Sequence, residues 1–281
     1  MSSLSSLWTE KLKLAFFFVY SHDMKVRDIE DIIEALAPLE LQESYDNAGL
    51  QVGIEHDEVK GVLVCLDITE DIIREANRKK CNLVVSHHPL IFRALKCVGD
   101  FTYQQRCVRE AITLGISLYS AHTNLDNARG GVNFKLAEKI GLRNIEWLSV
   151  VAGKDAGSGV VGELSEPQKV EDFLSWIKGL FGVSALRYSS TAKKSISRVA
   201  VCGGAGSFLM EDAKRCHADC FITGEFHYHD YFEAGDMMIA SLGHYESEKF
   251  TIELLSELLK NSCPNLRVEP TELNTNPIMI L

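Results

Sequence analysis

The chain has 281 residues, 46% of them hydrophobic and 24% charged, which is enough to bury the core of one large domain or of two smaller ones. Its net charge is −10, from 39 acidic and 29 basic residues. This excess of acid argues against strong nucleic-acid binding, because proteins that bind the backbone neutralise phosphates with clustered Lys and Arg. The eight cysteines include no C-x-x-C pair, which is typical of reduced thiols in a cytoplasmic protein.

The first 23 residues do not resemble the rest of the chain. Their apolar run at 14–20 follows Lys11 and Lys13, but it is too short to span a membrane and lacks a small-x-small cleavage site. A well-formed amphipathic helical pattern begins only after Met24, over residues 26–37. We therefore expect residues 1–23 to be an extension outside the fold. No other stretch is apolar enough to cross a bilayer, so no membrane association is expected.

From residue 24 onward the chain alternates strand and helix patterns. Strands are predicted at 61–66, 82–86 and 116–121, and the helices between them are predicted at 69–79 and 102–114. This βαβαβ order implies a parallel sheet. The carboxyl-terminal half repeats this order at 197–202, 207–217, 219–223, 228–235 and 237–242, and a long helix is predicted from about 246 to 260. The sequence thus predicts an α/β fold of duplicated βαβαβ units with mostly parallel strands.

The middle of the chain has a different composition. A Gly-rich link at 153–162 separates a helical pattern near 131–140 from a helix near 167–180 and a strand near 184–188. We expect residues 24–126 and 200–281 to form a metal-binding α/β lobe and residues 127–199 to form a second, smaller lobe.

Three predicted strands end on side chains that bind metals. The pairs are His87 with His88, His122 with Asp126, and His244 with Glu248. Each pair alone has an ordinary alternative: one histidine of the first pair can be buried and the other exposed, Asp126 can cap a helix, and Glu248 can complement a helix amino terminus. Because ligands of open parallel sheets bind at the carboxyl ends of the strands, the recurrence favours one inorganic site.

The ligand types constrain the metal. Imidazoles and carboxylates without thiolate suit Zn, Mn, Fe or Ni, and they disfavour a structural zinc site. Four to six such ligands are enough for two divalent ions about 4 Å apart, an arrangement that activates water and binds phosphate.

Two loops that follow predicted strands are candidates for substrate contact or catalysis. The backbone of Gly203, Gly204 and Gly206 could bind an anion, although an ordinary turn explains these glycines equally well. In the next loop, Glu225 and His227 are candidates for general acid or base catalysis, as is His229, which could equally cap a helix with Asp230.

Several motifs together resemble the Nif-three-like family, also called type-two GTP cyclohydrolase I. The resemblance begins near Met24 and runs in the same order to near the end of the chain. It is carried by Asp46 to Gly53, Ser86 to Phe92, His122 to Asp126 with Gly130 to Asn133, Thr223 to Glu225, Gly243 with His244, and Ser247 with Glu248.

The resemblance implies two interlocked α/β lobes, a centre with two divalent metal ions, and a ring-shaped homohexamer. It implies the metal ligands His87, His88, Asp126, His244 and Glu248, with Glu248 bridging, and it makes His122 either a ligand or a residue beside the metals. Asp46 and Asn47 join the three loop glycines as candidates for a substrate or anion loop. The chain resembles the short form of the family, without the inserted central domain.

The reaction implied by the resemblance is hydrolysis of a small nucleotide-like compound. The GTP cyclohydrolase type opens the guanine imidazole ring by attack of metal-bound hydroxide on C8. A metal-binding scaffold or metal-handling protein is the alternative without catalysis. A phosphoesterase is a third, to which the acidic net charge is a mild objection.

Overall fold

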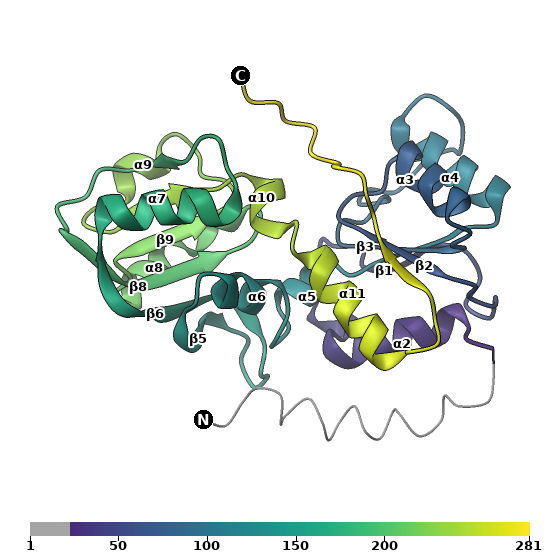
Figure 1. Ribbon diagram of the computed structural model, residues 1–281, viewed down its shortest axis with the longest axis horizontal. Coiled ribbons are helices and arrows are strands. Elements are labelled where there is room, and N and C mark those ends of the chain that lie inside the picture. The colour runs from purple at the N-terminus through teal and green to yellow at the C-terminus, as the bar shows by residue number, and fades with distance from the viewer. Residues whose placement is uncertain (1–22) are drawn as a thin grey trace. The chain divides into compact units, whose positions relative to one another are not determined.

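The computed structural model describes residues 23–281, so all but the last residue of the predicted extension lies outside the described residues. The chain forms two compact units (Figure 1). Within the described part, unit 1 comprises residues 23–124 and 252–275, and unit 2 comprises 125–251 and 276–281. Each unit contains one β-sheet with helices, which confirms the predicted α/β class.

The sheet of unit 1 is mostly parallel. Its strands, in spatial order, are β1 (Gly49–Val52), β4 (Ser117–Ser120), β3 (Leu83–Ser86), β2 (Val62–Cys65) and β11 (Val268–Pro270). Only β1 runs antiparallel to its neighbour. Every residue of β2, β3 and β4 is buried, since helices cover both faces, and this explains their nearly continuous apolar sequence.

Helices cover both faces of this sheet. Figure 1 shows α3 (Glu70–Arg78) and α4 (Tyr103–Leu114) on one face, and α2 (Val26–Leu36) and α11 (Thr251–Ser262) on the other; a short 3-10 turn, η1 (Leu39–Leu41), follows α2. Thr69 and Thr102 cap α3 and α4, because each hydroxyl accepts a hydrogen bond from a backbone N–H of the first turn. Helix α4 ends at Gly115, whose positive φ of 64° favours glycine.

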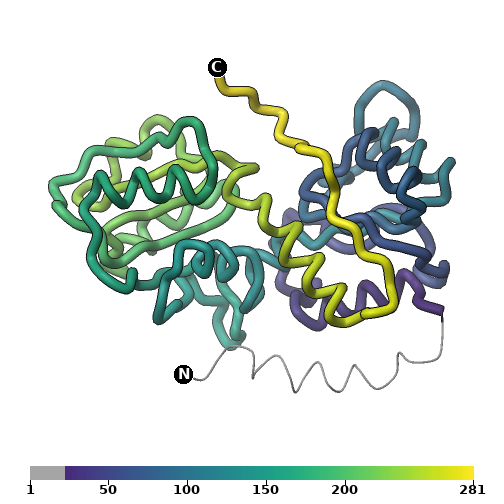
Figure 2. Tube along the Cα trace, in the orientation of Figure 1, coloured from purple at the N-terminus to yellow at the C-terminus, as the bar shows by residue number. Residues whose placement is uncertain are grey.

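A buried carboxylate fixes the carboxyl-terminal segment to unit 1. The fully buried Glu75 side chain accepts hydrogen bonds from the Thr271 hydroxyl, the Glu272 N–H and Lys79 Nζ. Burial alone would raise the pKa of Glu75, but these donors hold it below its usual value. Residues just beyond β11 are thereby attached to α3, and in Figure 2 the yellow trace of this segment runs along the blue part of the chain.

The sheet of unit 2 is mixed. Its strands, in spatial order, are β5 (Arg143–Val150), β6 (Gly157–Lys169), β8 (Ser195–Cys202), β9 (Cys220–Thr223), β10 (Met238–Ser241) and β7 (Arg187–Tyr188). The neighbours β8, β9 and β10 are parallel, and the other pairings are antiparallel. The parallel triplets β2-β3-β4 and β8-β9-β10 are therefore the predicted duplicated βαβαβ units.

The helices of unit 2 are mostly short. They are α5 (Thr123–Asp126), which begins two residues before this unit, α6 (Val132–Lys139), α7 (Val170–Phe181), η2 (Gly206–Leu209), α8 (Met210–Arg215), α9 (Asp230–Glu233) and α10 (His244–Glu248). Helices α6 and α7 pack against β6 and β8. On α7, the buried side chains Phe173, Ile177 and Phe181 recur at helical spacing. Among the residues described, no helix combines the length and the apolar character needed to cross a lipid bilayer.

Two details differ from the sequence-based expectations. The single helix predicted from about 246 to 260 is two helices, α10 and α11, because the backbone turns at Lys249 and Phe250, where Lys249 Nζ donates to the Phe181 carbonyl. The compact units also divide the chain elsewhere than the predicted lobes do. Strand β8 pairs with the 13-residue β6, and this pairing groups residues 200–251 with 125–199.

Candidate metal centre

The parallel triplet of unit 1 brings three histidines to one edge of its sheet. Cys65, Ser86 and Ser120 are in register at the carboxyl ends of β2, β3 and β4. His87 and His88 follow β3 directly, and His122 follows β4 by two residues. The ends of two of the three predicted strands, β3 and β4, therefore converge at this edge, whereas the third, β10, belongs to the sheet of unit 2.

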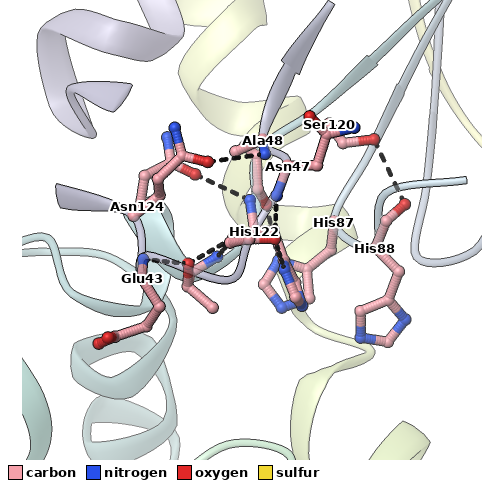
Figure 3. Close-up of polar contacts among 12 residues, drawn as sticks. Glu43, Asn47, Ala48, His87, His88, Ser120, His122 and Asn124 are labelled. Atoms are coloured by element: carbon pink, nitrogen blue, oxygen red, sulfur yellow. Dashed lines mark hydrogen bonds and ion pairs between the residues drawn. The ribbon is translucent and has the colours of Figure 1, made fainter. Parts of the chain in front are cut away.

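The three imidazoles lie close together (Figure 3). Their ring centroids are 4.9 Å apart for His87 and His88, 5.3 Å for His87 and His122, and 5.6 Å for His88 and His122. One nitrogen from each ring lies within 4.8 Å of the others. His87 is buried and the other two are partly buried, so this group could hold a metal ion.

Each of these rings has its Nδ1 bonded to an oxygen. His87 Nδ1 lies 2.8 Å from the Ala121 carbonyl, His88 Nδ1 lies 2.7 Å from Asp67 Oδ1, and His122 Nδ1 lies 2.7 Å from Asp46 Oδ1. Carbonyl and carboxylate oxygens only accept, so Nδ1 is the donor in each ring, and in a neutral imidazole this leaves the lone pair on Nε2. This arrangement is typical of histidines that ligate a metal through Nε2.

Asp46 fixes the position of the His122 ring. Its side chain is fully buried and accepts hydrogen bonds from His122, from the Thr123 N–H at 3.0 Å and from the Thr123 hydroxyl. Burial raises the pKa of Asp46, but these hydrogen bonds outweigh it and lower the pKa to about 2. Asp46 was a candidate for substrate contact, but its carboxylate points into the protein, and its neighbour Asn47 donates to the Ile91 carbonyl.

Asp67 is the partner of His88, which the sequence analysis missed. It follows β2 by two residues, and its second oxygen accepts a hydrogen bond of 2.6 Å from the Thr275 hydroxyl. Burial raises the pKa of Asp67, yet the hydrogen bonds from His88 and Thr275 leave it below its usual value. The available signal was its place after a buried strand that neighbours the strand before His88.

In unit 2, candidate metal ligands also follow the ends of the parallel strands. His244 begins α10 just after β10, and Glu248 lies one turn later, with Oε2 3.2 Å from His244 Nε2. Glu225 follows β9, and its Oε1 lies 3.1 Å from His244 Nδ1. The Glu248 side chain is only 4% exposed. A fourth histidine therefore also has an oxygen at Nδ1, and its Nε2 faces a carboxylate.

The loop after β8 packs against Glu248. A Cβ placed on Gly204 would lie 2.4 Å from Glu248 Oε1, so any other residue here would displace the carboxylate from this position. The loop N–H groups donate to side chains of the same unit: Gly203 to Asn133, Gly204 to Ser247 and Gly206 to Thr223. These donors are thus occupied by side chains of α6, α10 and β9 rather than directed at an anion.

Asp126 belongs to the same part of unit 2. Asn133 connects it to the loop after β8, since Asn133 Nδ2 donates to the Asp126 carbonyl and Asn133 Oδ1 accepts from the Gly203 N–H. Burial raises the pKa of the Cys202 thiol far above its usual value, and the charges of Asp126 and Glu248 raise it further. Cys202 is therefore a neutral thiol beside carboxylates.

The two candidate catalytic residues lie in different surroundings. Glu225 contacts His244, and its side chain is 56% exposed. His227 is exposed, and its backbone N–H donates to Asp230 where α9 begins. His229 precedes α9, and its ring contacts Tyr228 and Phe232. Of these candidates, only Glu225 has a described contact with a predicted metal ligand.

Comparison with known proteins identifies the relatives of this chain. The family model described as Duf34/NIF3 (NGG1p interacting factor 3) matches residues 24–277. The chain belongs to the Duf34/NIF3 family. A Clostridium perfringens relative, "GTP cyclohydrolase 1 type 2 homolog", is 38% identical over 241 residues, which cover 84% of this chain and 92% of the relative.

Other members of the Duf34/NIF3 family extend the similarity. "NIF3-like protein 1" of Drosophila melanogaster is 30% identical over 255 residues, 88% of this chain and 86% of the relative. The crystal structure of Staphylococcus aureus protein SA1388 superposes with a TM-score of 0.85 at 28% identity, covering 92% of this chain and all of that one. The Duf34/NIF3 match begins at Met24 and leaves residues 1–23 outside it.

Proposed function

We propose that this Duf34/NIF3 protein is a metal-dependent hydrolase of a small nucleotide-like substrate and that it uses two divalent metal ions. The observation that carries the proposal is the orientation of four histidines, each of which has Nδ1 bonded to an oxygen acceptor. Histidines that only pack in the core or face solvent need not all use Nδ1 for a hydrogen bond to oxygen. Metal ligation through Nε2 supplies a reason for this shared orientation.

The proposed ligands are those that the resemblance implies: His87, His88, Asp126, His244 and Glu248. His122, which has the same ring orientation, is a sixth ligand or lies beside the metals. Neutral imidazoles and carboxylates fit Zn, Fe, Mn or Ni.

When bound, divalent ions act as Lewis acids and lower the pKa of a coordinated water molecule. The protein's own residues orient the ligands: Asp67 holds His88, Asp46 holds His122 and Glu225 holds His244. We assign proton transfer to Glu225 and His227. The exposure of both side chains makes them reachable from solvent.

The names of the relatives support a nucleotide as the substrate class, with ring opening of the GTP cyclohydrolase type as the specific reaction proposed. A homohexamer and a cytoplasmic location complete the proposal, and these rest on the family resemblance and on cysteine usage. Gly203, Gly204 and Gly206 have no role in binding substrate in this proposal, because their N–H groups already donate to side chains of unit 2.

The decisive experiment measures metal content and hydrolysis together. Elemental analysis of the parent should find two divalent ions per chain. Glu248→Ala should lose most of both ions, because a bridging carboxylate is shared, and its circular dichroism spectrum should stay nearly unchanged. Retention of two ions by Glu248→Ala would remove the bridging role.

Catalysis is tested with His227→Ala, because His227 has no described contact with a proposed ligand. It should keep both metals and lose roughly 100- to 10,000-fold in turnover of the parent's substrate, the usual contribution of a general acid or base. Glu225→Ala should lose turnover too, and metal affinity as well, because His244 loses its Nδ1 acceptor. A metal-loaded parent that hydrolyses no nucleotide in a broad panel would favour the metal-binding scaffold.

A further inference from the structure

Two large aromatic side chains are exposed in unit 1 and contact each other. Tyr45 is 64% exposed and Phe92 is 42% exposed. Their ring centroids are 6.3 Å apart with an angle of 69° between the planes, which is a favourable edge-to-face contact. They come from segments 47 residues apart in the chain. Exposed apolar surface of this kind often marks a binding site.

This aromatic pair, Tyr45 with Phe92, adjoins the histidines. The Phe92 ring meets the His122 ring edge to face at a centroid distance of 5.9 Å and an angle of 89°. Tyr45 immediately precedes Asp46, the carboxylate that holds His122. Both members of the pair are therefore tied to the position of His122, all within unit 1.

Hydrogen bonds fix the two segments against each other. Asn47 Nδ2 donates to the Ile91 carbonyl at 2.7 Å, and the Ile91 N–H donates to Gln51 Oε1 at 3.0 Å. Gln51 Nε2 donates in turn to the Asn47 carbonyl at 2.6 Å. This closed set of bonds joins the residues next to Tyr45 and Phe92. The aromatic pair is thus placed before any ligand arrives, which lowers the entropy cost of binding.

We propose that Tyr45 and Phe92 bind the heteroaromatic ring of a nucleotide by stacking and hold it beside His122. This inference rests on the proposed function and specifies how its substrate is recognised. Flat π-faces are shared by all nucleobases, and aromatic side chains stack on them without base-specific hydrogen bonds. Arg93, next to Phe92, is exposed, so its positive charge is available to a nucleotide phosphate.

The test compares ligands with and without the ring. Binding of GTP, ATP, CTP and tripolyphosphate to the metal-loaded full chain is measured by calorimetry. Tyr45→Ala and Phe92→Ala should each weaken nucleotide binding roughly 5- to 150-fold, the range found for loss of one stacking partner. Tripolyphosphate affinity and metal content should not change. Tyr45→Phe and Phe92→Tyr keep the rings and should bind nucleotides nearly as the parent does.

A matched control separates stacking from general exposure. Phe101 is 85% exposed in the same unit, and Phe101→Ala should leave nucleotide affinity unchanged. The inference is overturned if nucleotide affinity is unchanged in both alanine variants, if tripolyphosphate binding falls equally, or if the metal-loaded parent binds no nucleotide. A change of oligomer size in these variants would also overturn it, because the pair would then be an interface between copies. Failure of the proposed function appears separately, as a parent without metals or as a metal-loaded parent that binds nucleotides but hydrolyses none.

Discussion

The contact between Gly204 and Glu248 can be tested with a pair of matched glycine substitutions. Gly204 and Gly182 have nearly the same positive φ, +59° and +63°. A Cβ on Gly182 would meet nothing within 4 Å, whereas a Cβ on Gly204 would lie 2.4 Å from Glu248 Oε1 and 3.3 Å from His244 Cε1. Alanine at either position costs about 1–2 kcal/mol, because a left-handed conformation brings Cβ close to the backbone.

Gly204→Ala has a second cost that Gly182→Ala lacks. The overlap with Glu248 adds about 1–3 kcal/mol, as overpacking usually does, so the total is roughly 2–5 kcal/mol against about 1–2 for the control. Because the overlapping atom ends a long side chain, the carboxylate moves away and metal binding suffers most. Urea denaturation gives the free energy of unfolding, and elemental analysis gives the metal content. Equal destabilisation of both variants, with metals retained in Gly204→Ala, would refute this reasoning.

Three further predictions concern charge and metal. Asp67→Asn should weaken divalent-metal binding about 10- to 100-fold in calorimetry, because His88 loses the carboxylate that orients its ring. The control Asp71→Asn, on the exposed side of α3, should leave metal affinity unchanged. Equal metal affinities of the two variants would contradict the role of Asp67. Asp219 accepts hydrogen bonds from Lys193 and from two backbone N–H groups. Burial raises the pKa of Asp219, but these hydrogen bonds outweigh it and lower the pKa. Ionised Asp219 therefore stabilises the fold fully above the unfolded pKa of about 3.9, and this stabilisation is lost as pH falls through the lower folded pKa. Asp219→Asn should reduce the loss of stability between pH 5 and pH 2, and an identical pH profile would argue against this. Metal at 100 times its dissociation constant should raise the free energy of unfolding by about 2.7 kcal/mol at neutral pH, and a melting temperature that does not respond to a chelator would exclude a tight site.

The repeated βαβαβ units could be predicted because their signals are local. Buried strands such as β3 read as short apolar runs, and α3 and α4 show helical periodicity with threonine caps. The positions of His87, His88 and His122 then followed from a general rule about parallel sheets, since the residue after each strand lies at one edge.

The partners of the histidines could not be predicted in this way. Asp67 lies 21 residues from His88, and Asp46 lies 76 residues from His122, so each pairing depends on how strands and loops are placed in space. The pairing of β8 with β6 could not be predicted for the same reason, because antiparallel pairing between distant segments leaves no periodic pattern in either sequence. For the loop after β8, composition alone could not show whether the glycine N–H groups face an anion or neighbouring side chains.

The position of β11 has a consequence for how the chain folds during synthesis. Unit 2 is almost contiguous, over residues 125–251, whereas the sheet of unit 1 needs β11 from residues 268–270 beside β2. The ribosome therefore releases all the strands of unit 2 before the edge of the first sheet can be paired. Until then β2 is an open parallel edge, the kind of strand that recruits other chains. The bonds from Thr271 and Glu272 to Glu75 then attach the residues that follow β11 to α3, so the edge of β2 stays open to other chains until β11 has been released.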